Sequence, residues 1–212
     1  MSLLINPEPV TFTSSLITRF MPAKIARSRL GRAVYLAAGY LPVELSEELV
    51  DAFASALLIE SELRLAVLRR GAGRSEYLGV VSRKVITDAG VAAVVNAFRN
   101  TFELELFNYH GLGTGSTAEA TAQTALVTEL TTQYATDNTR PAGTQSAPVA
   151  NQYQSVATIT VDAAASVTEH GLFSQAAAPG GTLWDRSVFG ALALNTGDAI
   201  VATYIATITS GG

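Results

Sequence analysis

The sequence contains no cysteine and only two histidines, so few side chains are suited to binding a soft metal ion or forming a covalent intermediate. Disulfide bonds, thiolate nucleophiles and cysteine-ligated metals are excluded. The patterns Gly-x-Ser-x-Gly and His-Glu-x-x-His, typical of serine hydrolases and zinc proteases, are also missing. We therefore predict that the chain is not an enzyme and uses no metal or other cofactor.

Charged residues make up only 15% of the chain, whereas soluble globular chains usually contain about 25%. No apolar run reaches the roughly 18 residues that a helix needs to cross a bilayer, which predicts no membrane partner. Much of the surface must then consist of small neutral residues or be covered by other chains. The second possibility favours an obligate assembly.

Positive charge is nearly lacking after residue 110, where only Arg140 and Arg186 accompany seven acidic residues. It gathers instead in residues 19–32, which contain no acid and carry Arg19, Lys24, Arg27, Arg29 and Arg32. Five charges on a short segment attract phosphate modestly, and no interleaved aromatics or zinc spacing accompany them. We predict no nucleic-acid partner; the segment forms the solvated face of a short helix or docks on an acidic protein surface.

The first twenty residues favour an extended conformation, because Pro7 and Pro9 oppose a helix and apolar residues alternate after them. Such an arm can add a strand to a neighbour, and the alternative is a frayed terminus. The strongest helical pattern follows at residues 47–70. Ser46 is a suitable N-cap, acidic residues fill the first turn, and basic residues lie near the end.

Residues 77–86 predict a strand, and Thr87 and Asp88 predict the cap of a second helix over residues 89–98. Its inward-facing side chains should be Val91, Val94, Val95 and Phe98. Alternation over residues 102–110 predicts a half-exposed strand.

The glycine-rich stretch at residues 110–117 matches neither established phosphate-loop pattern, because its glycines alternate and no lysine follows. We interpret it as a tight structural turn. Glu169 and His170 are adjacent, so on a strand they face opposite sides and cannot share a metal. The histidines are expected to bond turn backbone. Asp185 and Arg186 are expected to form a structural ion pair, within one subunit or between subunits.

Residues 132–151 predict a long surface loop. The β-rich remainder predicts strands at residues 153–161, 167–174, 182–194 and 199–209. We interpret the last three as a meander, with Trp184, Phe189 and Tyr204 in the core or at an oligomer contact. The expected fold class is α+β, with an arm at residues 1–20, a mixed helical and strand region at 21–110, and an antiparallel β-sandwich or barrel at 111–212.

Six segments between residues 79 and 209 carry a similarity to known sequences. They are GVVSRKVITDAGVAAVVNAF (79–98), YHGLGTGSTAEATAQTALVTEL (109–130), NTRPAGTQSAPVANQYQSVATIT (138–160), VTEHGLFSQAA (167–177), GGTLWDRSVF (180–189) and NTGDAIVATYIATIT (195–209). Together they resemble tailed-bacteriophage virion proteins of the head-decoration (cement) or fibre-associated type. The most specific pieces are structural motifs, so the resemblance implies a virion structural protein and transfers no functional residues.

The sequence therefore predicts a decoration protein on the capsid surface that contacts the major capsid protein and assembles with itself, as a trimer. The expected capsid-binding residues belong to the arm and the basic segment: Phe12, Leu16, Arg19, Lys24, Arg27 and Arg29. The alternative is a tail-fibre, baseplate or receptor-binding protein that binds host glycan through exposed aromatics, with Tyr134 and Tyr153 as candidates.

Overall fold

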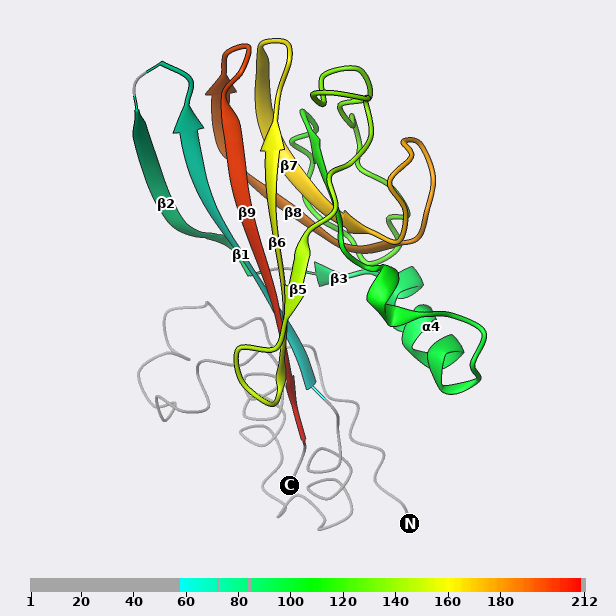
Figure 1. Ribbon diagram of the computed structural model, residues 1–212. Coiled ribbons are helices and arrows are strands. Elements are labelled where there is room, and N and C mark those ends of the chain that lie inside the picture. The colour runs from blue at the N-terminus through cyan, green and yellow to red at the C-terminus, as the bar shows by residue number, and fades with distance from the viewer. Residues whose placement is uncertain (1–57, 72, 84, 211–212) are drawn as a thin grey trace, which may run out of the picture. The chain divides into compact units, whose positions relative to one another are not determined.

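The computed structural model describes residues 58–71, 73–83 and 85–210, and almost all of its regular structure is β-strand (Figure 1). The residues from Leu57 to Ser210 form one compact unit. Its elements in chain order are β1 (Leu58–Arg69), β2 (Arg74–Ser82), β3 (Val85–Ile86), α4 (Asp88–Phe98), the 3-10 helix η1 (Leu104–Leu106), β4 (Tyr109–Gly113), β5 (Thr144–Ser146), β6 (Gln152–Thr160), β7 (Ala165–Phe173), β8 (Leu183–Leu194) and β9 (Ala199–Thr209).

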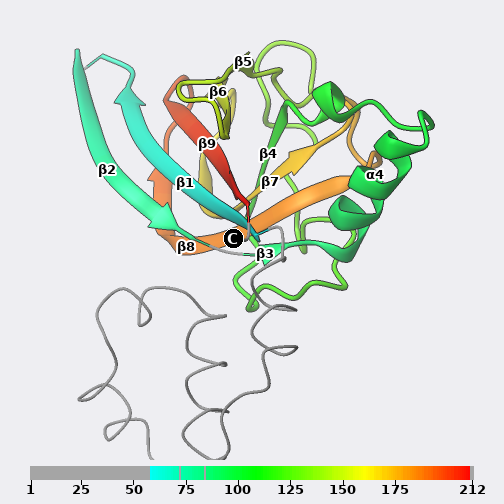
Figure 2. The same cartoon turned by 90° about the horizontal axis from the view of Figure 1, so that it is seen from below.

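The strands form two antiparallel sheets that pack face to face (Figure 2). One sheet has the order β2-β1-β9-β6-β5 and the other the order β3-β8-β7-β4. Side chains from both sheets form the main apolar cluster between them: Leu63, Leu65, Val67, Ala157, Ile159, Ile200 and Ala202 from the first, and Leu112, Val167 and Leu194 from the second. The prediction of a β-rich, antiparallel fold is confirmed at this level.

The helix predicted over residues 47–70 is wrong for residues 58–69, which form strand β1; the earlier part lies outside the described residues. Leu63, Leu65 and Val67 are buried at every second position, which is the period of a strand. β1 is hydrogen-bonded on both sides, to β2 and to β9. Pairing in the centre of a sheet thus overrides the helical preference of its leucine, glutamate and arginine residues.

The three C-terminal strands lie close to their predicted positions, but they do not form a meander. β7 and β8 pair in the four-stranded sheet, whereas β9 lies between β1 and β6 in the five-stranded sheet. The short connection at residues 195–198 therefore carries the chain from one layer to the other. This crossing places β9 in the centre of the five-stranded sheet, where most of its residues up to Ala206 are buried and only its last two are exposed.

Helix α4 begins as predicted: the Thr87 hydroxyl oxygen accepts the backbone N–H of Gly90 at 2.9 Å. Its predicted inner face is right for Val94, which packs in the cluster that contains Trp184 and Phe107, and wrong for Val91, Val95 and Phe98, which are exposed. Gly90 and Ala93 are the buried residues of the helix. The helix approaches β8 so closely that a Cβ at Gly90 would lie 2.8 Å from the Trp184 carbonyl oxygen. Only small side chains fit there, which turns most of the valines and Phe98 outward.

The half-exposed strand predicted at residues 102–110 is also wrong, since these residues contain η1 and only the beginning of β4. The glycine-rich stretch runs in β4 as far as Gly113 and then continues without regular structure, so its first glycines lie in a strand rather than in a tight turn. The expected domain boundary after residue 110 falls within this strand.

Candidate functional site

An ion pair between Glu169 on β7 and Arg186 on β8 occupies the centre of the polar interior. The Arg186 Nε donates to Glu169 Oε2 at 2.7 Å, and both side chains are buried. The same carboxylate accepts three backbone N–H groups at 2.8 to 3.1 Å, from Gly115, Val127 and Thr128. The ion pair therefore fixes residues 115–128 against the four-stranded sheet.

The alternating glycines of residues 111–115 make room for this carboxylate. A Cβ at Gly113 would lie 2.5 Å from Glu169 Oε1 and 2.6 Å from the Thr128 carbonyl oxygen. A Cβ at Gly115 would lie 2.6 Å from the same carboxylate oxygen. Close approach of a buried side chain explains these glycines, because neither has the positive φ that a tight turn often requires.

A second buried ion pair joins Arg140 to Glu129. The Arg140 guanidinium donates to both Glu129 carboxylate oxygens and lies 3.5 Å from the centre of the Phe173 ring. Its Nη1 donates to the carbonyl oxygens of Gln175, Ala177 and Gly180 at 2.9 to 3.1 Å. One arginine thus holds two separate loops, residues 129–140 and 174–182. The long segment at 132–151 is consequently anchored to the core rather than free.

Tyr134 lies in this anchored segment and is completely buried. Its hydroxyl accepts the Leu112 N–H at 2.7 Å and donates to the Leu112 carbonyl oxygen at 3.1 Å. The idea that Tyr134 is an exposed glycan-binding aromatic is therefore wrong. Tyr153 is partly buried, and its hydroxyl donates to the Phe107 carbonyl oxygen.

The two histidines bond each other rather than turn backbone. His110 Nδ1 lies 2.9 Å from His170 Nε2, and His110 Nε2 lies 2.8 Å from the Ser155 hydroxyl of the opposite sheet. Burial lowers the pKa of His170 to about 3 and holds the pKa of His110 well below its usual range. Both rings are therefore neutral near pH 7.

A serine hydroxyl hydrogen-bonded to a histidine has the residue types of a catalytic nucleophile and its general base. Here none of the three side chains is exposed, and the Gly143 backbone packs directly over the Ser155 hydroxyl. No substrate can reach that hydroxyl in this structure. The three hydrogen-bonded side chains of Ser155, His110 and His170 form a polar link between the two sheets.

Asp185 and Arg186 do not pair with each other, which corrects the predicted ion pair. They are neighbours on β8 and face opposite sides, as alternation along a strand requires. Asp185 accepts hydrogen bonds from Ser61 at 2.7 Å and Ser187 at 3.1 Å. Burial raises the pKa of Asp185 to about 6.

Two of the predicted core or oligomer residues meet in the second apolar cluster. Trp184 Nε1 donates to the Tyr204 hydroxyl at 2.7 Å, and both side chains are buried with Phe107. Phe189 is partly buried against the main cluster. The predicted capsid-binding residues Phe12, Leu16, Arg19, Lys24, Arg27 and Arg29 lie outside the described residues.

The outer face of the five-stranded sheet carries a small polar cavity of about 230 Å³. Its lining residues are Glu62, Arg64, Pro148, Gln152, Gln154, Ile205 and Thr207. Glu62 already pairs with Arg64 and with Arg83, so its charge is compensated. Within residues 58–210, apart from the two undescribed positions, no group of three or more histidine or acidic side chains is placed to bind a metal ion.

The part of the chain that the structure describes contains no helix long and apolar enough to span a membrane. Comparison with models of protein families, with curated proteins and with solved structures found no match to this chain.

The contacts between distant segments were not predictable from local patterns. Glu169 and Arg186 are 17 residues apart, and His110 and His170 are 60 apart. The one available signal was the scarcity of positive charge after residue 110. Two isolated arginines in a neutral, acidic half of the chain are candidates for buried ion pairs.

Proposed function

We propose that this chain is a structural protein of the tailed-phage virion, a decoration protein that binds the capsid surface as a homo-oligomer and bridges major capsid proteins. One observation carries the proposal. The segments that resemble virion proteins are the ones whose side chains and backbone meet around the two buried ion pairs.

The motif GTGST supplies Gly113 and Gly115, which pack against the Glu169 of TEHGLF; GGTLWDRSVF supplies Arg186. In the NTGD turn, the Asp198 carboxylate accepts the backbone N–H groups of Asn195 and Arg70, which lowers the pKa of Asp198. These motifs therefore fix loops and turns in place. The resemblance therefore concerns residues that stabilise the fold, which suits a protein with a mechanical role.

The interior also suits that role energetically. A carboxylate that accepts several hydrogen bonds and pairs with a buried arginine is rigidly held, because charge-assisted bonds are about twice as strong as neutral ones. Residues 115–128, 129–140 and 174–182 are all attached in this way. A loop held by a buried charge resists local opening, as a protein on a pressurised shell requires.

The finer architecture is part of the proposal. An extended arm at residues 1–20 and the basic segment at 19–32 would grip the capsid lattice through Phe12, Leu16, Arg19, Lys24, Arg27 and Arg29. The two-sheet unit would form the outer body. Apolar area buried across neighbouring capsomers, at about 25 cal/mol per Å², would reinforce the shell.

The receptor-binding alternative has less support, because one of its two aromatic candidates is buried and the hydroxyl of the other is engaged within the protein. A tail location remains the outcome to be distinguished by experiment.

The test is the position and copy number of the chain in purified particles, measured by quantitative mass spectrometry and by cryo-electron microscopy. Density repeated over the whole head surface is expected. A few copies at one vertex would replace the decoration role by a tail role, and a chain missing from mature particles would overturn the proposal.

A binding assay with undecorated capsids tests the attachment segment. Deletion of residues 1–20 should abolish binding while the circular dichroism of the β-sheets is unchanged. The matched control is Val149→Glu, a charge placed on an exposed loop of the described unit, which should bind normally. If the truncated chain still saturates the capsids, the arm is not the attachment segment.

A further inference from the structure

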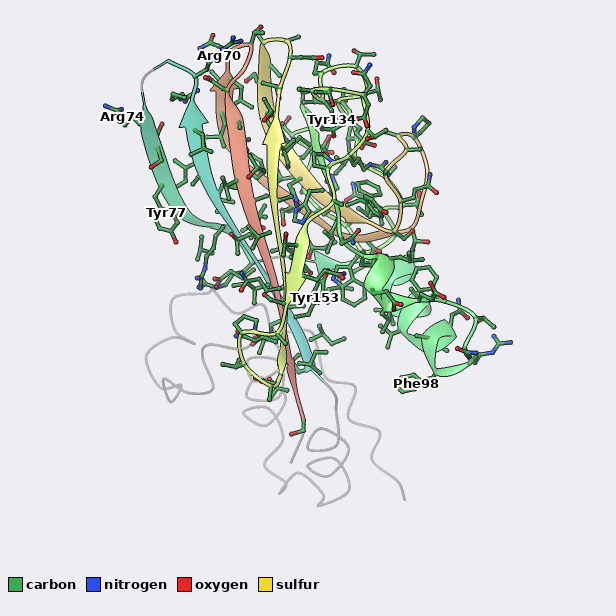
Figure 3. All side chains as sticks on the ribbon, in the orientation of Figure 1. Arg70, Arg74, Tyr77, Phe98, Tyr134 and Tyr153 are labelled. Atoms are coloured by element: carbon green, nitrogen blue, oxygen red, sulfur yellow. The ribbon has the colours of Figure 1, made fainter. Side chains whose placement is uncertain are left out.

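Helix α4 presents an apolar face to solvent. The exposed fractions of Val91, Val95 and Phe98 are 53%, 55% and 85%. Phe98 projects from α4 away from the two sheets (Figure 3). An α-helix turns by about 100° per residue, so these three side chains fall within about 60° of one another. They form a continuous stripe, which we call the α4 stripe, where a solvated helix normally carries polar residues.

The inner side of α4 is already occupied. Gly90 and Ala93 are buried, and Ala93 and Val94 pack in the cluster that contains Trp184 and Phe107. The helix is therefore fixed to the body by its small residues. The α4 stripe cannot turn inward without losing that packing, so it stays available to another chain.

Charges at the two ends of the helix identify the occupant. Asp88 begins α4 and Arg99 is its C-cap. Within the described residues, neither side chain has a hydrogen-bond or ion-pair partner. At about 100° per residue they lie only about 20° apart around the axis, on the same flank of the stripe. They lie five and six residues from the helix midpoint at Ala93, on opposite sides of it.

This arrangement is self-complementary. If a second α4 packs antiparallel across the stripe, residues on the same flank of the two helices face each other. Asp88 of each copy then meets Arg99 of the other, and the interaction occurs twice. Antiparallel packing also places the opposite ends of the two helix dipoles together. In a parallel two-fold pair Asp88 of each copy would lie level with Asp88 of the other and at the opposite end from Arg99, so no Asp88–Arg99 contact would form.

We propose that the α4 stripe binds a second copy of this chain, as an antiparallel, two-fold helix pair with reciprocal Asp88–Arg99 contacts. Val91 of one copy then packs between Val95 and Phe98 of the other, at the usual interaxial distance of about 8–10 Å. The inference is independent of where in a virion the chain acts. Contacts elsewhere can combine such pairs into a larger assembly.

The first experiment compares Val95→Glu with Val149→Glu in the full chain, by analytical ultracentrifugation over a wide concentration range. Val149 is a matched control because it is 50% exposed, close to the 55% of Val95. Val95→Glu should raise the dissociation constant of the pair at least about tenfold, and Val149→Glu should leave it unchanged. Glutamate favours helix at least as well as valine, so loss of α4 is not the expected cause.

The second experiment exchanges the end charges. Asp88→Arg and Arg99→Asp should each weaken the pair, because each creates two like-charge contacts. The double exchange Asp88→Arg/Arg99→Asp should restore most of the affinity of the original chain. A mere loss of helix stability would make the double variant at least as weak as the singles, and that result would overturn the proposal. Equal dissociation constants for Val95→Glu and Val149→Glu would also overturn the proposal. So would an original chain that stays monomeric at every concentration.

Discussion

Replacing Glu169 by glutamine tests whether the buried ion pair holds the fold together. Glutamine has nearly the same size as glutamate but no charge, and one of its terminal atoms is a donor. In the native protein both carboxylate oxygens accept, from the Arg186 guanidinium and from three backbone N–H groups. The variant therefore loses at least one backbone hydrogen bond and leaves the Arg186 charge buried without a counter-charge.

The expected cost follows from that burial. Arg186 is 1% exposed, so water cannot replace the lost carboxylate. Removing one partner of a buried pair typically lowers the free energy of unfolding by about 3–5 kcal/mol, a large share of the roughly 5–15 kcal/mol that stabilises most domains. Arg186→Met should cost a similar amount, since it strands the carboxylate. The double variant should cost less than the sum of the two single changes.

Urea denaturation followed by circular dichroism measures these differences as shifts of the midpoint at constant slope. The control is Glu62→Gln, which removes the charge that Glu62 contributes to its ion pairs with Arg64 and Arg83. The side chains of these two arginines are 44% and 68% exposed. Exposed pairs contribute less than about 1 kcal/mol. If Glu169→Gln shifts the midpoint no more than Glu62→Gln does, the buried pair does not hold the loops.

Two further predictions concern the histidine link and the glycine-rich strand. The unfolded chain protonates His170 near pH 6.5 and the folded chain only near pH 3, so stability should fall as the pH is lowered between these values, by up to about 1.4 kcal/mol per pH unit for this group. Asp185 has a raised pKa of about 6, so it binds a proton at higher pH in the folded than in the unfolded chain and opposes this loss of stability. Asp185→Asn should therefore make the loss of stability with falling pH steeper. Urea midpoints that stay constant from pH 7 to pH 4.5 in both proteins would contradict this. Gly113→Ala should lower the urea midpoint because its Cβ meets the Glu169 carboxylate, whereas Gly190→Ala, where no atom lies within 4 Å, should not; equal midpoints would show that close approach does not require Gly113.

Local signals predicted where elements begin and end when turn or cap residues mark those ends. The bounds of β9 and the Thr87 cap of α4 follow from turn residues and a capping hydroxyl that act within a few positions of the chain. The helix predicted through residue 70 failed because β1 lies between β2 and β9, and β9 is more than 130 residues away in the sequence. Its period-two leucines were visible, but leucine, glutamate and arginine also suit a helix.

The candidate sites divide in the same way. The scarcity of charge and the missing cysteine limited the chemistry open to the chain, and the two lone arginines of the C-terminal half stood out. Their partners, Glu129 and Glu169, could not be named, because either arginine could have paired with any of several acids. Pairing of His110 with His170 likewise depends on the register of β4 against β7.

By itself, the sequence determined that the described chain is rich in strands, where several of those strands and turns lie, and that Arg140 and Arg186 are the only basic residues after residue 110. The tertiary structure alone decided which sheet each strand joins, which acid neutralises each arginine and which face of α4 is left exposed. The physical reason is that a turn or a cap is stabilised by neighbours in the sequence. A sheet, a buried ion pair or a covered helix face is stabilised by residues that only folding brings together.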